Sequence, residues 1–268
     1  MRYTIGEVSE ILNISRDMVR YYEKQGVIQS HRNTSNNYRY YDTSIIFWLL
    51  ESIQFKNLGI NIKNISGVRM DDYVGQLVKH IELYENNLRD EISYRTILIE
   101  RVNQLKDRIS IGRYNIGNYW VTRVPAYYKS SLVEGQGDDY ERFTISPQSS
   151  AFVFSDQVNP FVDWGVTDSG GRQSWENFIE EQYVRRLQLS LPDDFVFVPG
   201  SLCFCTHIDM GAMGDFSQDR ISEFKEFAVK HYESAGLSPE QPVTGLLISR
   251  GFEDNLLHRI LELRLPIL

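Results

Sequence analysis

The chain has 268 residues, 42% hydrophobic and 24% charged, which fits a globular protein of more than one domain. No apolar run reaches the roughly 18 to 20 residues of a membrane-spanning helix, and Met1–Thr4 leads into a capped helix without a signal-peptide core, so we expect a cytoplasmic protein. The net charge of −8 divides into +2 for residues 1–63 and −10 for the remainder. A mildly basic head on an acidic body favours DNA binding at one end, with a dimer needed for useful affinity.

The first two predicted elements are short helices separated by a short turn. Thr4 and Glu7 form a capping box, and the apolar residues that follow predict a helix ending near Asn13. A second helix of about three turns runs from Ser15, which can cap it, to Gly26, which can end it. This pair predicts a helix-turn-helix, whose second helix enters the major groove of DNA. The alternative is a surface helix with an ordinary solvated face.

The second helix has an apolar face and a basic face. Helical spacing groups the apolar residues Met18, Val19 and Tyr22. The basic residues Arg16, Arg20 and Lys24 recur every four positions and therefore lie together on another face. We therefore expect the DNA contacts of this helix to come from Arg16, Arg20 and Tyr21.

Four stretches extend the pattern: TIGEVSEILNIS, VRYYEKQGVI, NNYRYYD and FKNLGINIKNI. In order and spacing they resemble the winged helix-turn-helix of the MerR family of transcription regulators. The resemblance implies that Tyr38 and Arg39 lie in a β-wing against the DNA backbone and that Lys56 lies in a second, helical wing. Asn36-Asn37 suits a hairpin turn, and the tyrosine hydroxyls and the guanidinium suit phosphates.

Two further helices are expected to support this head. One begins at Asp42 or Thr43 and continues to Asn57, where Leu58-Gly59 ends it. Asn61 can cap a short helix over residues 62–70. Both would pack on the helix-turn-helix and direct Lys56 outward.

Residues 75–111 predict one long helix with a coiled-coil seam. Counting in sevens gives the column Ile81, Leu88, Arg95, Val102 and Ile109. The second column is Tyr84, Leu98 and Leu105, or alternatively Ile92 and Ile99. Arg95 interrupts the seam. In MerR regulators the corresponding helix forms an antiparallel homodimer, whereas the alternative is an amphipathic helix that lies on its own domain.

The remainder of the chain predicts an antiparallel α+β domain with a cleft between two halves. Residues 111–118 mark the linker. We expect strands at 119–128, 151–155, 195–200, 203–208, 246–248 and 257–267, and helices at 173–187 and 217–234.

The sequences VFVPGSLCFCTHI and RILELRLPI, with the helix ending in SAG between them, resemble the GyrI-like effector domain of multidrug-sensing MerR proteins. The resemblance implies that Glu262 faces the ligand cavity, where a carboxylate would select cationic aromatic ligands. The alternative is a solvent-facing Glu262 paired with Arg264. Candidate ligand contacts are Glu262, Phe152, Phe154, Phe204 and Trp175, with Phe161 and Trp164 as further stacking aromatics. Residues 244–248 lack the tyrosine that multidrug sensors carry in this strand, so the ligand can differ from theirs.

Neither a metal site nor a catalytic motif is predicted. Cys203 and Cys205 lie on one face of a strand, which suits a soft metal but suits a reduced buried core better. The family's metal sensors carry a cysteine near the start of the dimer helix, and residues 76–92 contain none. The five histidines have no metal-ligand spacing, and phosphate-loop and nucleophile-elbow motifs do not occur.

These observations predict a multidomain α+β protein with a winged helix-turn-helix at 1–74, a coiled-coil dimerisation helix at 75–112 and a GyrI-like effector domain at 118–268. The expected function is a homodimeric activator that distorts promoter DNA, works with RNA polymerase and responds to a small, aromatic or cationic effector without a cofactor. The alternatives are a small-molecule-binding sink and a GyrI-like hydrolase with incidental DNA binding.

Overall fold

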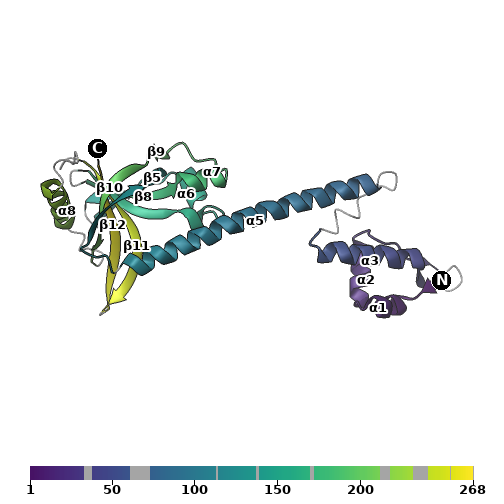
Figure 1. Ribbon diagram of the computed structural model, residues 1–268. Helices are drawn as coiled ribbons and strands as arrows, with labels where there is room; N and C mark the ends of the chain where they lie inside the picture. The colour runs from purple at the N-terminus through teal and green to yellow at the C-terminus, as the bar shows by residue number, and fades with distance from the viewer. Residues whose placement is uncertain are drawn as a thin grey trace. The chain divides into compact units, whose positions relative to one another are not determined.

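A computed structural model describes most of the chain: residues 1–32, 38–60, 73–112, 114–136, 139–169, 172–211, 218–231, 241–253 and 255–267. The chain forms two compact units, Met1–Ser93 and Tyr94–Leu268, and the long helix α5 (Tyr73–Gly112) contributes to both (Figure 1). None of the helices in the described ranges is both long enough and apolar enough to cross a membrane.

The first unit contains the expected helix-turn-helix, formed by α1 (Ile5–Leu12) and α2 (Arg16–Lys24). Thr4 and Glu7 make the reciprocal capping box at the start of α1, and the Ser15 hydroxyl accepts a hydrogen bond from the Met18 amide at the start of α2. After α2, Gly26 adopts a φ of 74°, a conformation that glycine takes without strain. The predicted start and stop signals are confirmed.

A small antiparallel sheet and a third helix complete this unit. Strand β3 (Arg39–Asp42) pairs with β2 (His31–Arg32) on one side, as expected for the predicted wing. On its other side it pairs with β1 (Arg2–Tyr3), a strand that the sequence pattern did not predict. Helix α3 (Thr43–Asn57) begins at its Asp42 cap, as expected. The core consists mainly of buried apolar side chains from α1, α2, β3 and α3, including Val8, Val19, Tyr22, Tyr41 and Leu49. The predicted turn at Asn36-Asn37 and the predicted helix at residues 62–70 lie outside the described residues.

The second unit is built on one antiparallel sheet. In the described residues its strands follow the order β4-β10-β12-β11-β7-β8-β5-β6, and β9 pairs with β5. Their bounds are β4 (Tyr119–Val124), β5 (Tyr127–Gln136), β6 (Asp139–Phe143), β7 (Asp163–Ser169), β8 (Arg172–Glu180), β9 (Val196–Val198), β10 (Ser201–Asp209), β11 (Val243–Glu253) and β12 (Leu256–Pro266).

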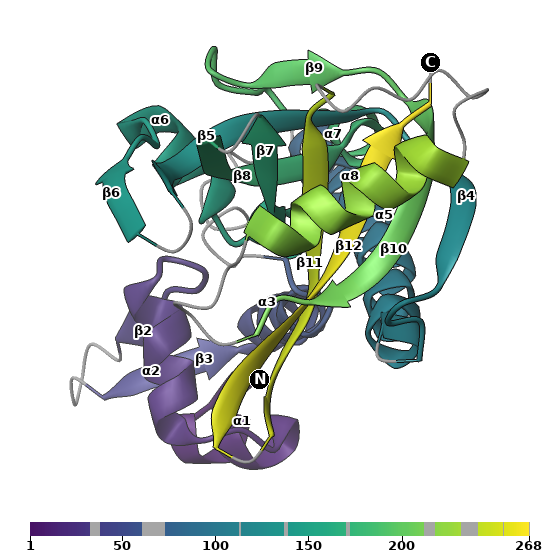
Figure 2. The same ribbon diagram turned by 90° about the vertical axis from the view of Figure 1, so that its left-hand side faces the viewer.

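Helices cover this sheet. Helix α8 (Gln218–His231) crosses β10, β11 and β12 (Figure 2). Its apolar side packs against Phe204 and the buried leucines of β12. The C-terminal half of α5 packs instead against α6 (Pro147–Val153), the short 3-10 turn η2 (Asn159–Phe161) and α7 (Glu181–Arg186). The predicted class, a helix-turn-helix followed by a long helix and an antiparallel α+β body, is confirmed.

Three predicted elements of the body are wrong. Residues 151–155 are not a strand, because Ser146 caps and Pro147 begins helix α6, which are ordinary helix-start signals. Residues 173–187 are not one helix: β8 ends at Glu180 and only α7 follows. Strand β8 lies between β7 and β5 and is buried on both faces, so it lacks the alternation that identifies a half-exposed strand. Finally, Pro125 separates β4 from β5 where a single strand was expected.

Candidate nucleic-acid interface and effector cavity

Helix α2 presents its basic face to solvent because its other face fills the core. Val19 and Tyr22 are almost fully buried, whereas Arg16, Arg20 and Tyr21 are exposed. The Arg20 guanidinium lies 3.2 Å from the Asp17 carboxylate, in an exposed pair that water screens. The three residues predicted to contact DNA from this helix are thus accessible.

The wing residues and Lys56 lie beside the same helix. The exposed Arg39 donates a hydrogen bond to Glu23 of α2 at 3.1 Å, which ties the wing strand to the helix. Tyr38 precedes it and is 75% exposed. Lys56, near the end of α3, extends its amine to 3.9 Å from the Met18 sulfur. Strand β3 and helix α3 therefore each place a basic side chain beside α2.

Helix α5 carries apolar side chains on the face that points away from its own body. The exposed stripe consists of Ile81, Leu88, Ile92, Ile99, Val102 and Ile109, each at least 40% exposed. The opposite face is buried in the second unit, with Ile97 and Arg101 at 3% and 1% exposure. One face of the helix lies on its own domain, as the second interpretation expected, and the other face leaves residues of the predicted seam exposed. For the second column of the seam, the exposed residues are Ile92 and Ile99, because Leu98 packs on its own body.

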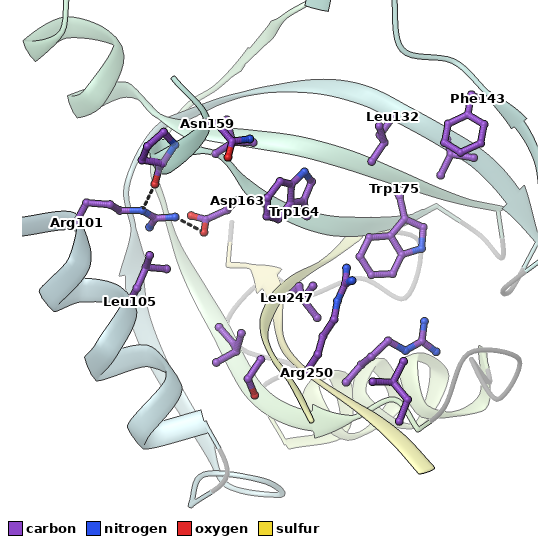
Figure 3. Close-up of a pocket in the computed structure, with 17 residues that line it drawn as sticks. Arg101, Leu105, Leu132, Phe143, Asn159, Asp163, Trp164, Trp175, Leu247 and Arg250 are labelled. Atoms are coloured by element: carbon purple, nitrogen blue, oxygen red, sulfur yellow. Dashed lines mark hydrogen bonds and ion pairs between the residues drawn. The ribbon is translucent and has the colours of Figure 1, made fainter. Parts of the chain in front are cut away.

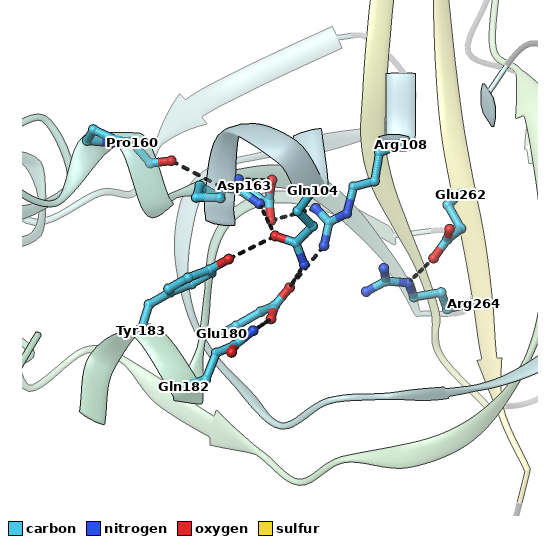
Figure 4. Close-up of polar contacts among 10 residues, drawn as sticks. Gln104, Arg108, Pro160, Asp163, Glu180, Gln182, Tyr183, Glu262 and Arg264 are labelled. Carbon is cyan, nitrogen blue, oxygen red and sulfur yellow. Dashed lines mark hydrogen bonds and ion pairs between the residues drawn. The ribbon is translucent and has the colours of Figure 1, made fainter. Parts of the chain in front are cut away.

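The buried face of α5 holds a polar network beside its apolar contacts. Arg101 donates to Asp163 at 2.6 Å, and Arg108 bridges Asp163 at 2.9 Å and Glu180 at 2.9 Å (Figure 4). Gln104 also donates to Glu180, at 3.0 Å. Burial opposes ionisation of Asp163, but the guanidinium groups of Arg108 and Arg101 outweigh it and lower the pKa of this carboxyl. The network fixes α5 to strands β7 and β8.

A cavity of about 860 Å³ lies in the second unit, where β11 separates from β7. This volume is within the range of small-molecule sites. Its wall combines aromatic and aliphatic groups with arginines and one carboxylate, and two of its residues come from α5 (Figure 3). The lining residues are Arg101, Leu105, Leu132, Val133, Phe143, Asn159, Pro160, Val162, Asp163, Trp164, Trp175, Leu247, Ile248, Ser249, Arg250, Leu257 and Arg259.

Two glycines explain where the cavity begins. Strands β7 and β11 pair only from Gly165 to Asp168 and from Val243 to Leu246. A Cβ on Gly165 would lie 2.4 Å from the carbonyl oxygen of Gly245, so a larger residue would force the strands apart. Beyond this close contact the strands diverge, and the space between them is the cavity.

Glu262 lies on β12 but is not part of the cavity lining. Its carboxylate accepts hydrogen bonds from Arg264 at 2.6 Å and makes a 3.3 Å contact with the His207 ring. Burial disfavours the charged form, yet the His207 hydrogen bond and the Arg264 charge lower the pKa of Glu262 to about 2. Neither interpretation of the sequence holds in full: the side chain is outside the lining of this cavity, and it is largely buried rather than facing solvent, but Arg264 is its partner as the second interpretation expected.

The predicted aromatic contacts separate into two groups. Trp175 and Trp164 line the cavity. The other predicted contacts do not: Phe204 is fully buried under α8, and Phe152 and Phe154 lie in and just after α6, not on a cavity strand. The sequence interpretation missed Arg101, Asp163, Arg250 and Arg259. The only signal for Arg101 was its seven-residue spacing from Arg108 on the predicted helix.

The cysteines occupy the interior of β10. Cys203 and Cys205 are buried, and burial raises the pKa of both thiols, that of Cys205 to about 12. A thiol that does not ionise at neutral pH is a poor metal ligand. Their surroundings fit the core interpretation.

Comparison with known proteins identifies the first unit. The family model described as "MerR family regulatory protein" matches residues 4–41. The transcriptional regulator BrlR of Pseudomonas aeruginosa is 26% identical over 174 residues, which are 61% of this chain and 63% of that protein, so the chain spans less than two thirds of that relative. The HTH-type transcriptional regulator ZntR homolog of Haemophilus influenzae is 29% identical over 105 residues, which are 36% of this chain and 78% of that protein.

Among solved structures, the EcmrR–DNA complex in EcmrR-RPo aligns with 99% of both chains at 14% identity and a TM-score of 0.35. The matched segment 4–41 contains α1, α2 and the wing strand β3, whose caps and exposed basic side chains are described above. The N-terminal part of this chain is therefore a MerR-family helix-turn-helix domain.

Proposed function

We propose that this protein is a homodimeric transcription regulator that binds double-stranded promoter DNA and responds to a small molecule. The observation that carries the proposal is the α2 face, where Arg16, Arg20 and Tyr21 are exposed within the MerR-family segment. Arg16 near the start of α2 would read base edges, and Tyr38, Arg39 and Lys56 would contact phosphates.

Dimerisation would come from the exposed stripe of α5. A continuous apolar stripe at heptad spacing is costly in water and is typical of a helix that pairs with another helix. A second copy of the chain would cover it and hold two reading heads on the two halves of an operator. The dimer also supplies the basic charge that a single head, at +2, lacks.

Ligand sensing would use the cavity of the second unit. Arg101 and Leu105 line it and belong to α5, the same helix that would form the dimer. A ligand with unequal affinity for two positions of α5 would shift the balance between two DNA-bound geometries. With RNA polymerase at the promoter, the favoured geometry would activate transcription by deforming the DNA.

The alternatives receive less support. A hydrolase would need a carboxylate base of raised pKa, whereas Glu262 is held ionised by Arg264 with a pKa of about 2. A ligand sink would not need an exposed basic recognition helix. The names of the relatives, which are regulators of transcription, favour the first function, and a cytoplasmic, cofactor-independent protein belongs to the same proposal.

The test is DNA binding by the full chain. Duplexes are selected from a randomised library, and their affinity is measured by fluorescence anisotropy at several salt concentrations. Arg16→Ala should weaken binding to the selected duplex by about tenfold or more and relax the base preference. Lys56→Ala should reduce the slope of the logarithm of the binding constant against the logarithm of salt concentration by about one unit. Arg123→Ala, an exposed arginine of β4 in the other unit, is the control. Equal binding of random and selected duplexes would exclude the proposed function.

A further inference from the structure

The charge of the cavity wall is opposite to that expected for a sensor of cations. Three guanidinium groups line it, those of Arg101, Arg250 and Arg259, against the single carboxylate of Asp163. A ligand that enters this space meets an excess of positive charge, and the low polarity of the wall strengthens its effect.

The negative charge of Asp163 is already neutralised by two arginines and is not available to a cationic ligand. Arg101 and Arg108 bind its two oxygens at 2.6 and 2.9 Å, so both are already engaged by cations. Glu262, the other carboxylate that could attract a cation, lies outside the lining and is paired with Arg264 at 2.6 Å. A cation in the cavity would lose its hydration without gaining a carboxylate partner.

Arg250 differs from the other two arginines in being exposed. Its side chain extends from β11 across the cavity toward Trp175, as Figure 3 shows. Within the described residues no carboxylate lies within ion-pair distance of it. Its planar guanidinium is therefore available to bind a carboxylate through two parallel hydrogen bonds.

The rest of the wall favours a flat apolar ring. Trp175 pairs in register with Val166, and Trp164 is two residues from Val166 on β7, so both indoles lie on the same face of the sheet. Leu132, Leu247 and Leu257 add aliphatic surface. The Trp175 indole N–H is buried and has no acceptor among the described residues, so Trp175 offers a ligand its ring rather than a hydrogen bond.

We infer that the effector is an aromatic anion, a flat ring system with a carboxylate that binds Arg250 while the ring packs against Trp164 and Trp175. This inference rests on the proposed function, because it assigns the ligand class of the same sensor. It replaces the cationic ligand that the sequence suggested, since the lining carries arginines where a cation would need a free carboxylate.

The test is isothermal titration calorimetry of the full chain with three probes of matched shape: naphthoate, naphthamide and naphthylmethylammonium. Naphthoate should bind most tightly. Arg250→Gln should weaken the binding of naphthoate by about tenfold, because a charge-assisted hydrogen-bonded pair is lost. The affinity for naphthamide should be almost unchanged. Arg123→Gln removes the same charge from an exposed position outside the cavity and should leave both affinities as they are.

Each other outcome overturns the inference: the ammonium binds as tightly as naphthoate, naphthamide matches naphthoate, none of the probes binds, or Arg250→Gln has no selective effect. DNA binding by the same preparations separates the two claims. Cation preference in a chain that still selects its duplex overturns the ligand class alone. Naphthoate binding by a chain that does not select DNA overturns the proposed regulator and leaves the cavity assignment intact.

Discussion

At the scale of single residues, the interior of the second unit depends on paired charges. Arg264 and Glu262 are two residues apart on β12 and lie on the face opposite its buried leucines, where His207 of β10 completes the cluster. Removing one member of such a pair leaves an unpaired charge in a largely dry environment, which costs more than the intact pair contributes. Glu262 is therefore a structural residue.

We expect Glu262→Gln to destabilise the protein at neutral pH and to flatten its acid sensitivity. The pKa of Glu262 is lowered from 4.5 to about 2, so its contribution is complete above the ordinary pKa and is lost as pH falls from about 5 to 2. A shift of this size corresponds to about 3 kcal/mol at most. Urea unfolding across this pH range measures both effects.

The control for this experiment is Glu100→Gln. Glu100 pairs with Arg186 at 3.0 Å on the surface, where solvent screens the interaction, so its loss should change the pH slope little. If the free energy of unfolding depends on pH in the same way for the parent and for Glu262→Gln, the neighbours of Glu262 do not lower its pKa.

At the scale of elements, α5 reverses the usual pattern of a surface helix. Arg101, Arg108 and Gln104 are turned into the protein, where carboxylates and the Tyr183 hydroxyl satisfy them, whereas the isoleucines of the exposed stripe are turned outward. Each face then has a separate role. The polar face fixes the helix to the cavity wall in one register, and the apolar face is left for a partner.

Ile99→Asp should convert the dimer to monomer without unfolding the chain. Ile99 is 63% exposed on the stripe, so an acid there is hydrated in the monomer but is buried opposite apolar groups in the dimer. Sedimentation equilibrium should show at least about a tenfold weaker dimer, and circular dichroism should show unchanged helix content.

Leu83→Asp is the matched control, because Leu83 is 57% exposed on the opposite side of the same helix. This variant should remain dimeric. Dissociation by both substitutions, or by neither, would place the dimer contact elsewhere.

At the scale of the whole molecule, the proposed regulator would gain specificity from two heads held apart by one pair of helices. A single head with little net positive charge binds weakly, and two linked heads gain from the high effective concentration of the second. The proposed regulator should therefore recognise the spacing of two half-sites as well as their bases.

We expect the full chain to bind an inverted repeat as a dimer, with two chains per duplex. Changing the spacer by half a helical turn should reduce affinity by about tenfold or more, because the second head then faces the wrong side of the DNA. Gel-shift stoichiometry with spacer variants measures this. Equal affinity for a single half-site and the full repeat would mean that the heads bind independently.

Local sequence signals were sufficient to predict the two helices of the helix-turn-helix. The Thr4–Glu7 capping box, the Ser15 cap and Gly26 each act over a few residues, so they define α1 and α2 wherever these helices lie in the fold. The same holds for the unbroken length of α5, which contains only one internal glycine near its start, Gly75. Strand β8 could not be identified in this way, because burial on both faces removes the periodicity that distinguishes a strand.

The sequence by itself determined the helix-turn-helix and the long helix, since caps, turns and heptad spacing depend on neighbouring residues. Only the tertiary structure decided the cavity and its charge. Strands β7 and β11 meet at Gly165 and Gly245 and then diverge, and this brings Arg101 and Arg250 into one wall from distant parts of the chain. Sequence alternation places a side chain on a face of its own strand, but which groups face it across a space depends on how the strands pack.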